Sequence, residues 1–178
     1  MASILTTTAQ AAHSAAASLL SAAQIQVGGV VPPEPVKEEE ATKSEPLPLT
    51  GINVIVGVPG AFTGTCSAQV PGYIQTLDQF KAKGVQNVFV VAVNDVFVTK
   101  AWKEQLAPNG TGVRFIADDT GAFTSKLGLV LDATPLLGAP RSKRYVIVAN
   151  GDKVQTLAIE EDPSKVTITD AKTILAQL

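Results

Sequence analysis

This chain of 178 residues contains one cysteine, and the residues around it make it the first candidate for chemistry. Cys66 follows a Pro59-Gly60 break and two hydroxyl residues, Thr63 and Thr65. After Cys66, apolar residues recur at helical spacing through Phe80, which predicts a helix whose first turn carries the thiol. Unpaired backbone N–H groups and the positive end of the helix dipole gather there, and both favour a thiolate over a thiol. The sequence therefore predicts a reactive cysteine.

Other interpretations of Cys66 stay open on the residues alone. A lone cysteine is often a small buried residue with no reaction of its own. A hydrolase-type cysteine needs a histidine as its base, and the only histidine, His13, lies in the expected N-terminal tail. A redox cysteine needs no histidine, because a helix N-terminus and a nearby arginine can hold its thiolate. Redox chemistry is thus favoured over acyl transfer.

Composition narrows the classes of function. The net charge is −2 with no basic cluster, which argues against a nucleic-acid or anionic-membrane surface. A single cysteine excludes a disulfide within the chain, and a single histidine argues against a metal site, so no metal or cofactor is expected. No apolar stretch reaches the roughly 20 residues that a membrane helix needs.

Two regions are expected along the chain. Residues 1–24 are rich in Ala, Ser and Thr and lack Lys, Arg, Asp and Glu, which predicts a tail, weakly helical at most over residues 11–20. This stretch lacks the basic residues of a secretory signal and the arginines of a mitochondrial presequence. Residues 25–178 are expected to form one compact domain, with a solvated charged loop over 37–44.

Apolar runs and helical periods alternate within the compact domain. The runs predict strands over Ile52–Val58, 87–93, 113–116, 145–149 and Lys153–Ile159. The helical periods predict helices over 66–84, 97–106 and 123–127, and a last helix capped by Thr169 or Asp170. Asn150-Gly151 is a strong hairpin signal, so an antiparallel pair follows a parallel βαβ core. This order predicts an α/β, thioredoxin-like fold with a mixed central sheet flanked by helices.

Several separated segments share one resemblance. Pro59, Thr63 and Cys66 stand at the spacing P-x-x-x-T-x-x-C, within VPGAFTGTCS and followed by VPGYI. The later segments VAVNDVFVTKAW, FIADDTGAFTSKLGL and RSKRYVIVANG match in the same order. Over residues 25–178 the chain resembles the peroxiredoxins, in particular the fungal and plant members of the peroxiredoxin-five-like (type II, atypical) branch. The resemblance implies a thiol-dependent peroxidase that reduces hydrogen peroxide and alkyl hydroperoxides.

The resemblance also implies roles for single residues. Cys66 is the expected peroxidatic cysteine, which becomes a sulfenic acid. Thr63 is expected to hydrogen-bond the thiolate and the peroxide, Pro59 to shield the site, and Arg144 to stabilise the thiolate and the departing oxygen. Without the resemblance, Thr63 would be a helix N-cap or a loop hydroxyl, Pro59 a strand terminator and Arg144 an exposed strand-end residue. Arg141 is a second, more distant candidate for the cation.

The chain departs from the family pattern in two ways. Between Cys66 and Gly72 the run is one residue shorter than in many relatives and lacks their histidine. The chain also has no second cysteine to resolve the sulfenic acid. An external thiol is therefore expected to complete a one-Cys mechanism, either glutathione together with glutaredoxin, or thioredoxin. A disulfide between Cys66 of two subunits is a weaker alternative. The resemblance further implies a homodimer.

Rival functions and the cellular location stay open. The same cysteine could serve a non-turnover peroxide sensor or a thiol-regulated binding protein, or the fold could be a catalytically dead scaffold. The cytoplasm is the first expectation for location. Ala176-Gln177-Leu178 resembles a weak variant of the S-K-L peroxisomal address, although these residues could equally just end a helix. The peroxisome is therefore the second expectation, with mitochondria as a further alternative.

Overall fold

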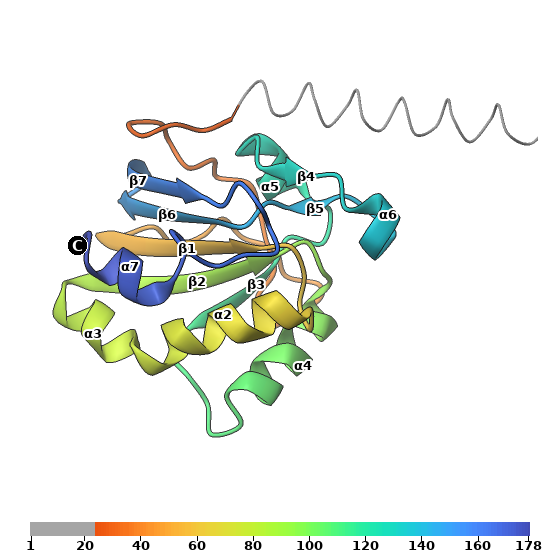
Figure 1. Cartoon of the computed structure of the whole chain (residues 1–178), viewed down its shortest axis with the longest axis horizontal. Coiled ribbons are helices and arrows are strands. Elements are labelled where there is room, and N and C mark those ends of the chain that lie inside the picture. The colour runs from red at the N-terminus through yellow and green to blue at the C-terminus, as the bar shows by residue number, and fades with distance from the viewer. Residues whose placement is uncertain (1–23) are drawn as a thin grey trace, which may run out of the picture.

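The computed structural model describes residues 24–178, so the predicted tail lies outside the described residues except for Gln24. A five-stranded sheet has the order β3-β2-β1-β6-β7 (Figure 1). Its strands are β1 (Ile52–Val58), β2 (Val85–Ala92), β3 (Arg114–Ala117), β6 (Tyr145–Asn150) and β7 (Lys153–Ile159). The first three are parallel, and β6 and β7 are antiparallel to their neighbours. This confirms the predicted thioredoxin-like fold with a mixed sheet.

Helices cover both faces of the sheet. On one face lie α2 (Gly64–Gln75), α3 (Leu77–Ala82), α4 (Val96–Leu106) and α7 (Ala171–Leu175), which share one hydrophobic cluster with β1 (Figure 1). The short helix α5 (Ala122–Lys126) contributes to a second cluster on the opposite face. Asp170, as predicted, caps α7, its side chain accepting a hydrogen bond from the N–H of Lys172.

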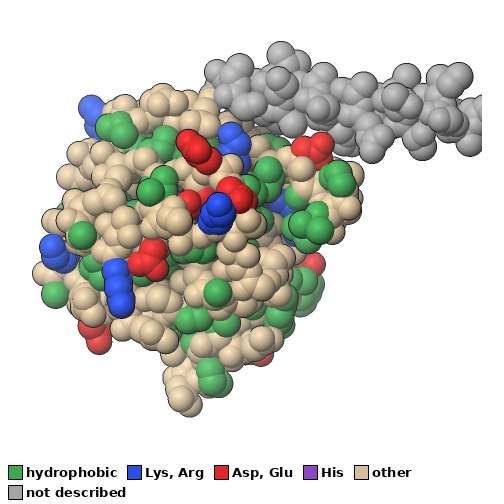
Figure 2. All heavy atoms as spheres, in the orientation of Figure 1, with side chains coloured by type: hydrophobic (Ala, Val, Ile, Leu, Met, Phe, Trp, Pro, Cys, Tyr) green, Lys and Arg blue, Asp and Glu red, His purple; other side chains and the backbone are tan. Residues whose placement is uncertain are grey.

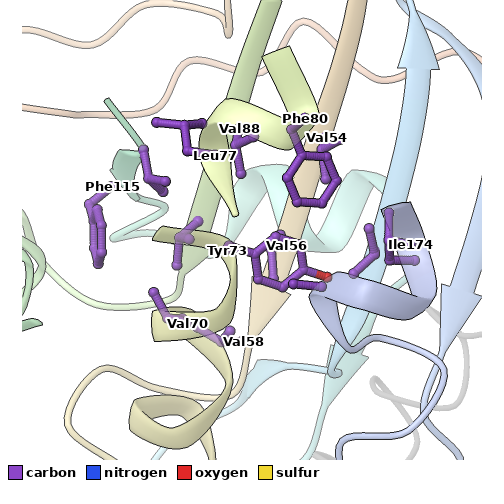
Figure 3. Close-up of a cluster of buried hydrophobic side chains, with 14 of the residues drawn as sticks. Val54, Val56, Val58, Val70, Tyr73, Leu77, Phe80, Val88, Phe115 and Ile174 are labelled. Atoms are coloured by element: carbon purple, nitrogen blue, oxygen red, sulfur yellow. The ribbon is translucent and has the colours of Figure 1, made fainter. Parts of the chain in front are cut away.

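Alternation along β1 separates the two clusters. Successive side chains of a strand point to opposite faces, so Val54, Val56 and Val58 join the helical cluster and Ile55 joins the other. Figure 3 shows the helical cluster, with aromatic rings contributed by α2 and α3. The rings of Tyr73 and Phe80 are stacked with their centroids 5.7 Å apart. This packing fixes α2, the helix that carries the cysteine, against the centre of the sheet.

Gly57 is required by a close approach within the sheet. It pairs with Tyr145 of β6, and a Cβ at Gly57 would meet the Tyr145 ring at 2.0 Å. Only a residue without a side chain leaves space for that ring. The ring lies on the face opposite α2, so β1 presents valines to one face and makes room for tyrosine on the other.

The segment that precedes β1 reaches both edges of the sheet. Near β7, the N–H of Val31 donates to the carbonyl of Asp152 at 2.7 Å. Beyond β3, Lys37 and Ala117 exchange backbone hydrogen bonds of 3.0 and 2.8 Å, and the ammonium of Lys37 lies 2.7 Å from an Asp119 carboxylate oxygen. The predicted charged loop is therefore partly docked rather than wholly solvated.

The structure differs from the predicted elements in two respects. The predicted helix over 66–84 is broken at Thr76, whose hydroxyl donates to the carbonyl of Gly72 at 2.7 Å and whose backbone leaves the helical region. Two short strands and one short helix were not predicted, because they have too few residues for periodicity to reveal: β4 (Val130–Leu131), α6 (Thr134–Leu137) and β5 (Arg141–Ser142).

The visible surface carries charges of both signs. Acidic and basic side chains are interspersed over the face shown in Figure 2, and no large patch of one sign gathers there. Among the helices of residues 24–178, none combines the length and the apolar character needed to cross a bilayer.

Candidate active site

Cys66 lies in the first turn of α2, as predicted, and its side chain is fully buried. Two contacts hold this turn. The N–H of Ser67 donates to the carbonyl of Thr63 at 2.9 Å, and the indole N–H of Trp102 on α4 donates to the Ser67 hydroxyl at 3.1 Å. The thiol therefore occupies a fixed position at the positive end of a helix, beside backbone N–H groups that have no partner within the helix.

Arg144, the residue directly before β6, contacts the sulfur. Its Nη2 lies 3.5 Å from the Cys66 Sγ, and Nε and Nη2 donate to the carbonyl of Pro163 at 3.0 and 2.8 Å. The Nη1 donates to the side-chain oxygen of Gln69. Within residues 24–178, no carboxylate forms a salt bridge with this guanidinium.

The expectation that Arg144 is exposed, drawn from its residue type alone, was wrong. The side chain is 1% exposed, because the segment after β7 folds back over it and offers the Pro163 carbonyl. A buried cation needs an anion or several oriented acceptors. Here Pro163 and Gln69 supply neutral acceptors, and the Cys66 sulfur is the remaining contact, so a thiolate would complete the charge balance.

Thr63 and Pro59 lie in the turn between β1 and α2. Thr63 occupies the N-cap position without capping, since its hydroxyl donates to the carbonyl of Gly60 at 3.0 Å. The hydroxyl proton is thus directed at Gly60 rather than at the sulfur. Pro59 is buried directly after the last residue of β1. Between them, Phe62 has φ 64° and is 47% exposed, a strained conformation for a bulky residue.

Arg141, the second candidate for the cation, is used elsewhere. Its Nη1 donates to the carbonyl of Val93 at 2.7 Å, at the end of β2, and its Nη2 reaches the carbonyl of Leu137 at 3.5 Å. The guanidinium that contacts the sulfur is that of Arg144. Within residues 24–178, no group of three His, Cys, Asp or Glu side chains is placed to hold a metal ion.

Sequence reasoning missed three polar residues around the arginine. Gln69 is 4% exposed, and its amide nitrogen donates to both the carbonyl and the hydroxyl oxygen of Thr169 at 3.0 Å. The hydroxyl of Thr169 in turn donates to Glu160 at 2.8 Å. Gln69 could have been found, because it lies one helical turn after Cys66 on the same face. Thr169 and Glu160 left no signal, since only the folded chain brings them near residue 66.

Two ionisable groups beside the site have shifted pKa values. Burial alone raises the pKa of Glu160, but backbone and hydroxyl hydrogen bonds from Thr167 and Thr169 outweigh it, so the pKa of the carboxyl lies below its usual range. Burial, with smaller contributions from Asp170 and Glu160, raises the pKa of Tyr73, whose hydroxyl donates to the carbonyl of Thr169 at 2.6 Å. Glu160 is therefore a carboxylate and Tyr73 a neutral phenol at neutral pH.

Comparisons with known proteins agree with this geometry. The model of the Redoxin family matches residues 41–175. Peroxisomal membrane associated protein 20 of Schizosaccharomyces pombe is 45% identical over 86% of this chain and 99% of its own length. Peroxiredoxin-2C of Oryza sativa is 46% identical over 70% of this chain and 76% of its own length.

A solved structure adds a match in three dimensions. Reduced Prx3 of Vibrio vulnificus, in complex with hydrogen peroxide, superposes with a TM-score of 0.79 at 37% identity, over 87% of this chain and 100% of its own. The buried thiol at the start of a helix, the arginine on its sulfur and these similarities have one explanation: the chain belongs to the Redoxin family and, within it, to the peroxiredoxins.

Proposed function

We propose that the protein is a thiol-dependent peroxidase with a one-Cys mechanism, which reduces hydrogen peroxide and alkyl hydroperoxides. The observation that carries the proposal is the contact between the Cys66 sulfur and the buried guanidinium of Arg144. A fixed cation next to a helix N-terminus stabilises a thiolate, which is the nucleophilic form of cysteine. Family membership supports the same chemistry.

The first step is a displacement at oxygen. The Cys66 thiolate attacks the terminal oxygen of the hydroperoxide, an S–O bond forms, and the O–O bond breaks. The sulfur is oxidised to a sulfenic acid, and the departing oxygen leaves as hydroxide or alkoxide, which takes up a proton to give water or an alcohol. Negative charge develops on that departing oxygen. We expect the guanidinium of Arg144, which Pro163 and Gln69 orient, to donate a hydrogen bond to it.

Thr63 and Pro59 shape the space in which this step occurs. Because the Thr63 hydroxyl donates to Gly60, its lone pairs stay available to accept a hydrogen bond from the peroxide O–H. A direct hydrogen bond from Thr63 to the thiolate requires this hydroxyl to rotate on binding. Pro59 has no N–H and is buried at the end of β1, so it excludes water from the site without adding a donor.

The second step needs a thiol from outside the chain. Cys66 is the sole cysteine of the sequence, so no intramolecular disulfide can form. One thiol attacks the sulfenic acid, releasing water and forming a mixed disulfide, and a second thiol releases the reduced cysteine together with an external disulfide. We infer glutathione with glutaredoxin, or thioredoxin, as the source. The full burial of Cys66 means that the first turn of α2 has to open for either reductant.

The test is peroxide consumption by wild type and by Cys66→Ser, with the glutathione/glutaredoxin system and the thioredoxin system supplied separately. Many equivalents consumed per protein, all lost in the serine variant, are the expected result, and the productive system identifies the donor. Consumption of a single equivalent with both systems present would instead favour a peroxide sensor or a thiol-regulated binding protein. Slow oxidation without saturation would favour a dead scaffold.

We further propose a homodimer that forms around the active-site loops. Exposed apolar side chains in and near these loops support it: Phe62 at 47%, Phe97 at 72% and Leu136 at 84% exposed. Light scattering on a size-exclusion column is expected to give twice the monomer mass, and a monomer mass at high protein concentration would exclude the dimer.

The cytoplasm is the proposed location. The peroxisome and mitochondria are alternatives, because the names of two relatives, Peroxisomal membrane associated protein 20 of Schizosaccharomyces pombe and Peroxiredoxin-2F, mitochondrial, of Arabidopsis thaliana, point to these compartments. Imaging of an N-terminally tagged full chain tests the location.

A further inference from the structure

Three polar side chains connect the loop after β7 to the active-site arginine. We infer that Glu160, Thr169 and Gln69 form a relay of hydrogen bonds that positions the guanidinium of Arg144 against the Cys66 sulfur. The inference rests on the proposed peroxidase function, because it names the residues on which the orientation of the arginine depends. In this relay Arg144 contacts the reacting atoms, and the other three are positioning residues.

The relay is continuous and buried. A carboxylate oxygen of Glu160 accepts from the Thr169 hydroxyl at 2.8 Å, and the oxygen of that hydroxyl accepts from the Gln69 amide nitrogen at 3.0 Å. The other end of the Gln69 amide accepts from Nη1 of Arg144. Gln69 is 4%, Thr169 0% and Glu160 7% exposed, so water does not compete for these hydrogen bonds.

Both ends of the relay determine the direction of every hydrogen bond. An arginine can only donate, so the Gln69 amide has to turn its oxygen towards Arg144 and its nitrogen towards Thr169. An ionised carboxylate can only accept, so the Thr169 hydroxyl donates its hydrogen bond to Glu160, and its oxygen can accept from Gln69. The lowered pKa of Glu160 is consistent with the ionised form. No member of the relay can reverse without leaving a buried group unpaired.

Glu160 also closes the loop that supplies the second support of the guanidinium. Its backbone N–H donates to the carbonyl of Arg144 at 3.0 Å, and its carboxylate also accepts from the backbone N–H and hydroxyl of Thr167 at 2.6 and 2.7 Å. Between these two points lies Pro163, whose carbonyl accepts two of the guanidinium hydrogen bonds. The relay thus orients the guanidinium through Nη1, and the loop orients it through Nε and Nη2.

Orientation of this plane matters for the rate. Nη2 is the guanidinium nitrogen that contacts the attacking sulfur, and a misplacement of about 1 Å in such a group can cost about 100-fold in rate. Alkylation of the same sulfur by iodoacetamide releases iodide and does not develop charge on an oxygen. It therefore requires the thiolate but not a precisely aligned donor, which separates positioning of Arg144 from general damage to the site.

The test compares Thr169→Val, Thr169→Ser and Thr156→Val in the full chain. Valine removes the relay hydroxyl at nearly constant volume, serine restores it, and Thr156 on β7 is a matched control whose hydroxyl lies outside the relay. For Thr169→Val we expect a loss of about tenfold in the rate constant of Cys66 with hydrogen peroxide and a much smaller loss with iodoacetamide. Thr169→Ser is expected to recover most of the peroxide rate, and Thr156→Val to match wild type in both reactions.

The outcomes separate the possible failures. Equal peroxide rates in Thr169→Val and wild type would overturn the relay, and so would equal losses in the two reactions, which indicate a merely structural role. Wild type that fails to turn over peroxide would instead overturn the proposed function. If thermal unfolding shows that Thr169→Val does not fold, Gln69→Met replaces it. That variant removes both the carbonyl oxygen and the amino group of the amide at similar side-chain length, and the same selective loss of the peroxide rate is required.

Discussion

Replacing Arg144 by lysine tests the proposed chemistry most directly, because the charge stays and the planar fork is lost. The guanidinium serves three acceptors at once: the Pro163 carbonyl through Nε and Nη2, Gln69 through Nη1 and the Cys66 sulfur through Nη2. A single ammonium nitrogen cannot span these positions. It will settle on some of them and leave the departing oxygen without an aligned donor.

The size of the effect follows from that lost donor. Removal of one donor from a site that stabilises a developing oxyanion costs about 10²–10³-fold in rate, or about 2.7–4 kcal/mol. The ammonium retains the positive charge, which recovers part of this loss at short range in a buried site. We therefore expect Arg144→Lys to react with hydrogen peroxide about 100-fold more slowly than wild type, equivalent to about 2.7 kcal/mol.

The assay is rapid mixing of the reduced protein with peroxide, followed by the fluorescence of Trp102. This is the only tryptophan of the chain, and its indole N–H donates to Ser67 beside Cys66, so oxidation of the sulfur changes its surroundings. Arg141→Lys is the matched control and is expected to react nearly as fast as wild type, because Arg141 supports the Val93 carbonyl instead. A wild-type rate in Arg144→Lys, or an equal loss in Arg141→Lys, would refute the assigned role.

Two further predictions concern stability. Because the pKa of Glu160 is lowered in the folded protein, its ionised carboxylate contributes to the free energy of unfolding above its ordinary pKa of 4.5. This contribution is lost as the pH falls through the lower pKa of the folded state. Glu160→Gln is thus expected to lower the free energy of unfolding by about 1–2 kcal/mol at neutral pH. The difference from wild type is expected to shrink below pH 4.5. Glu161 is exposed, so the control Glu161→Gln should change the free energy of unfolding little. Denaturant titrations from pH 3 to 7 measure this, and a difference that stays constant with pH would contradict it. Gly57→Ala places a methyl group into the Tyr145 ring and is expected to cost about 3 kcal/mol or more, while Gly64→Ala, with no atom within 4 Å of its Cβ, should be neutral or stabilising. Equal stability of the two alanine variants at neutral pH would show that the sheet gives way around the ring.

The sequence predicted the elements that depend on local pattern. The central strands are continuous apolar runs, Asn150-Gly151 gives the hairpin, and Cys66 follows a strand at the start of a helical period; the structure has all of these features. The break at Thr76 was missed, because a side-chain hydroxyl that bonds a backbone carbonyl leaves the apolar period unchanged. Residue pattern thus describes the scaffold but not the interruptions made by single hydrogen bonds.

The surroundings of the cysteine were less accessible to prediction. Residue type placed Arg144 on the surface, and only the resemblance indicated that it belongs to the site. Its burial depends on the loop containing Pro163, and the position of that loop depends on Glu160. The strands β6 and β7 separate Arg144 from Pro163 and Glu160 in the sequence, so no local spacing reveals that they meet. The part of the site that could be predicted lies on one helix, and the rest exists only in the folded chain.

The absence of a salt bridge at Arg144, within the described residues, has a consequence for the redox cycle. With a Cys66 thiolate the buried pair is electrically balanced, and the carboxylate of Glu160 is separated from the guanidinium by two side chains. A sulfenic acid is neutral, so oxidation leaves a cation in the interior without an adjacent anion, which is costly in a low-dielectric site. We therefore expect the oxidised protein to be less stable around α2 than the reduced protein, and opening of the first turn would relieve that imbalance. On the proposed mechanism, the charge that stabilises the thiolate would also favour exposure of the sulfenic acid to its reductant.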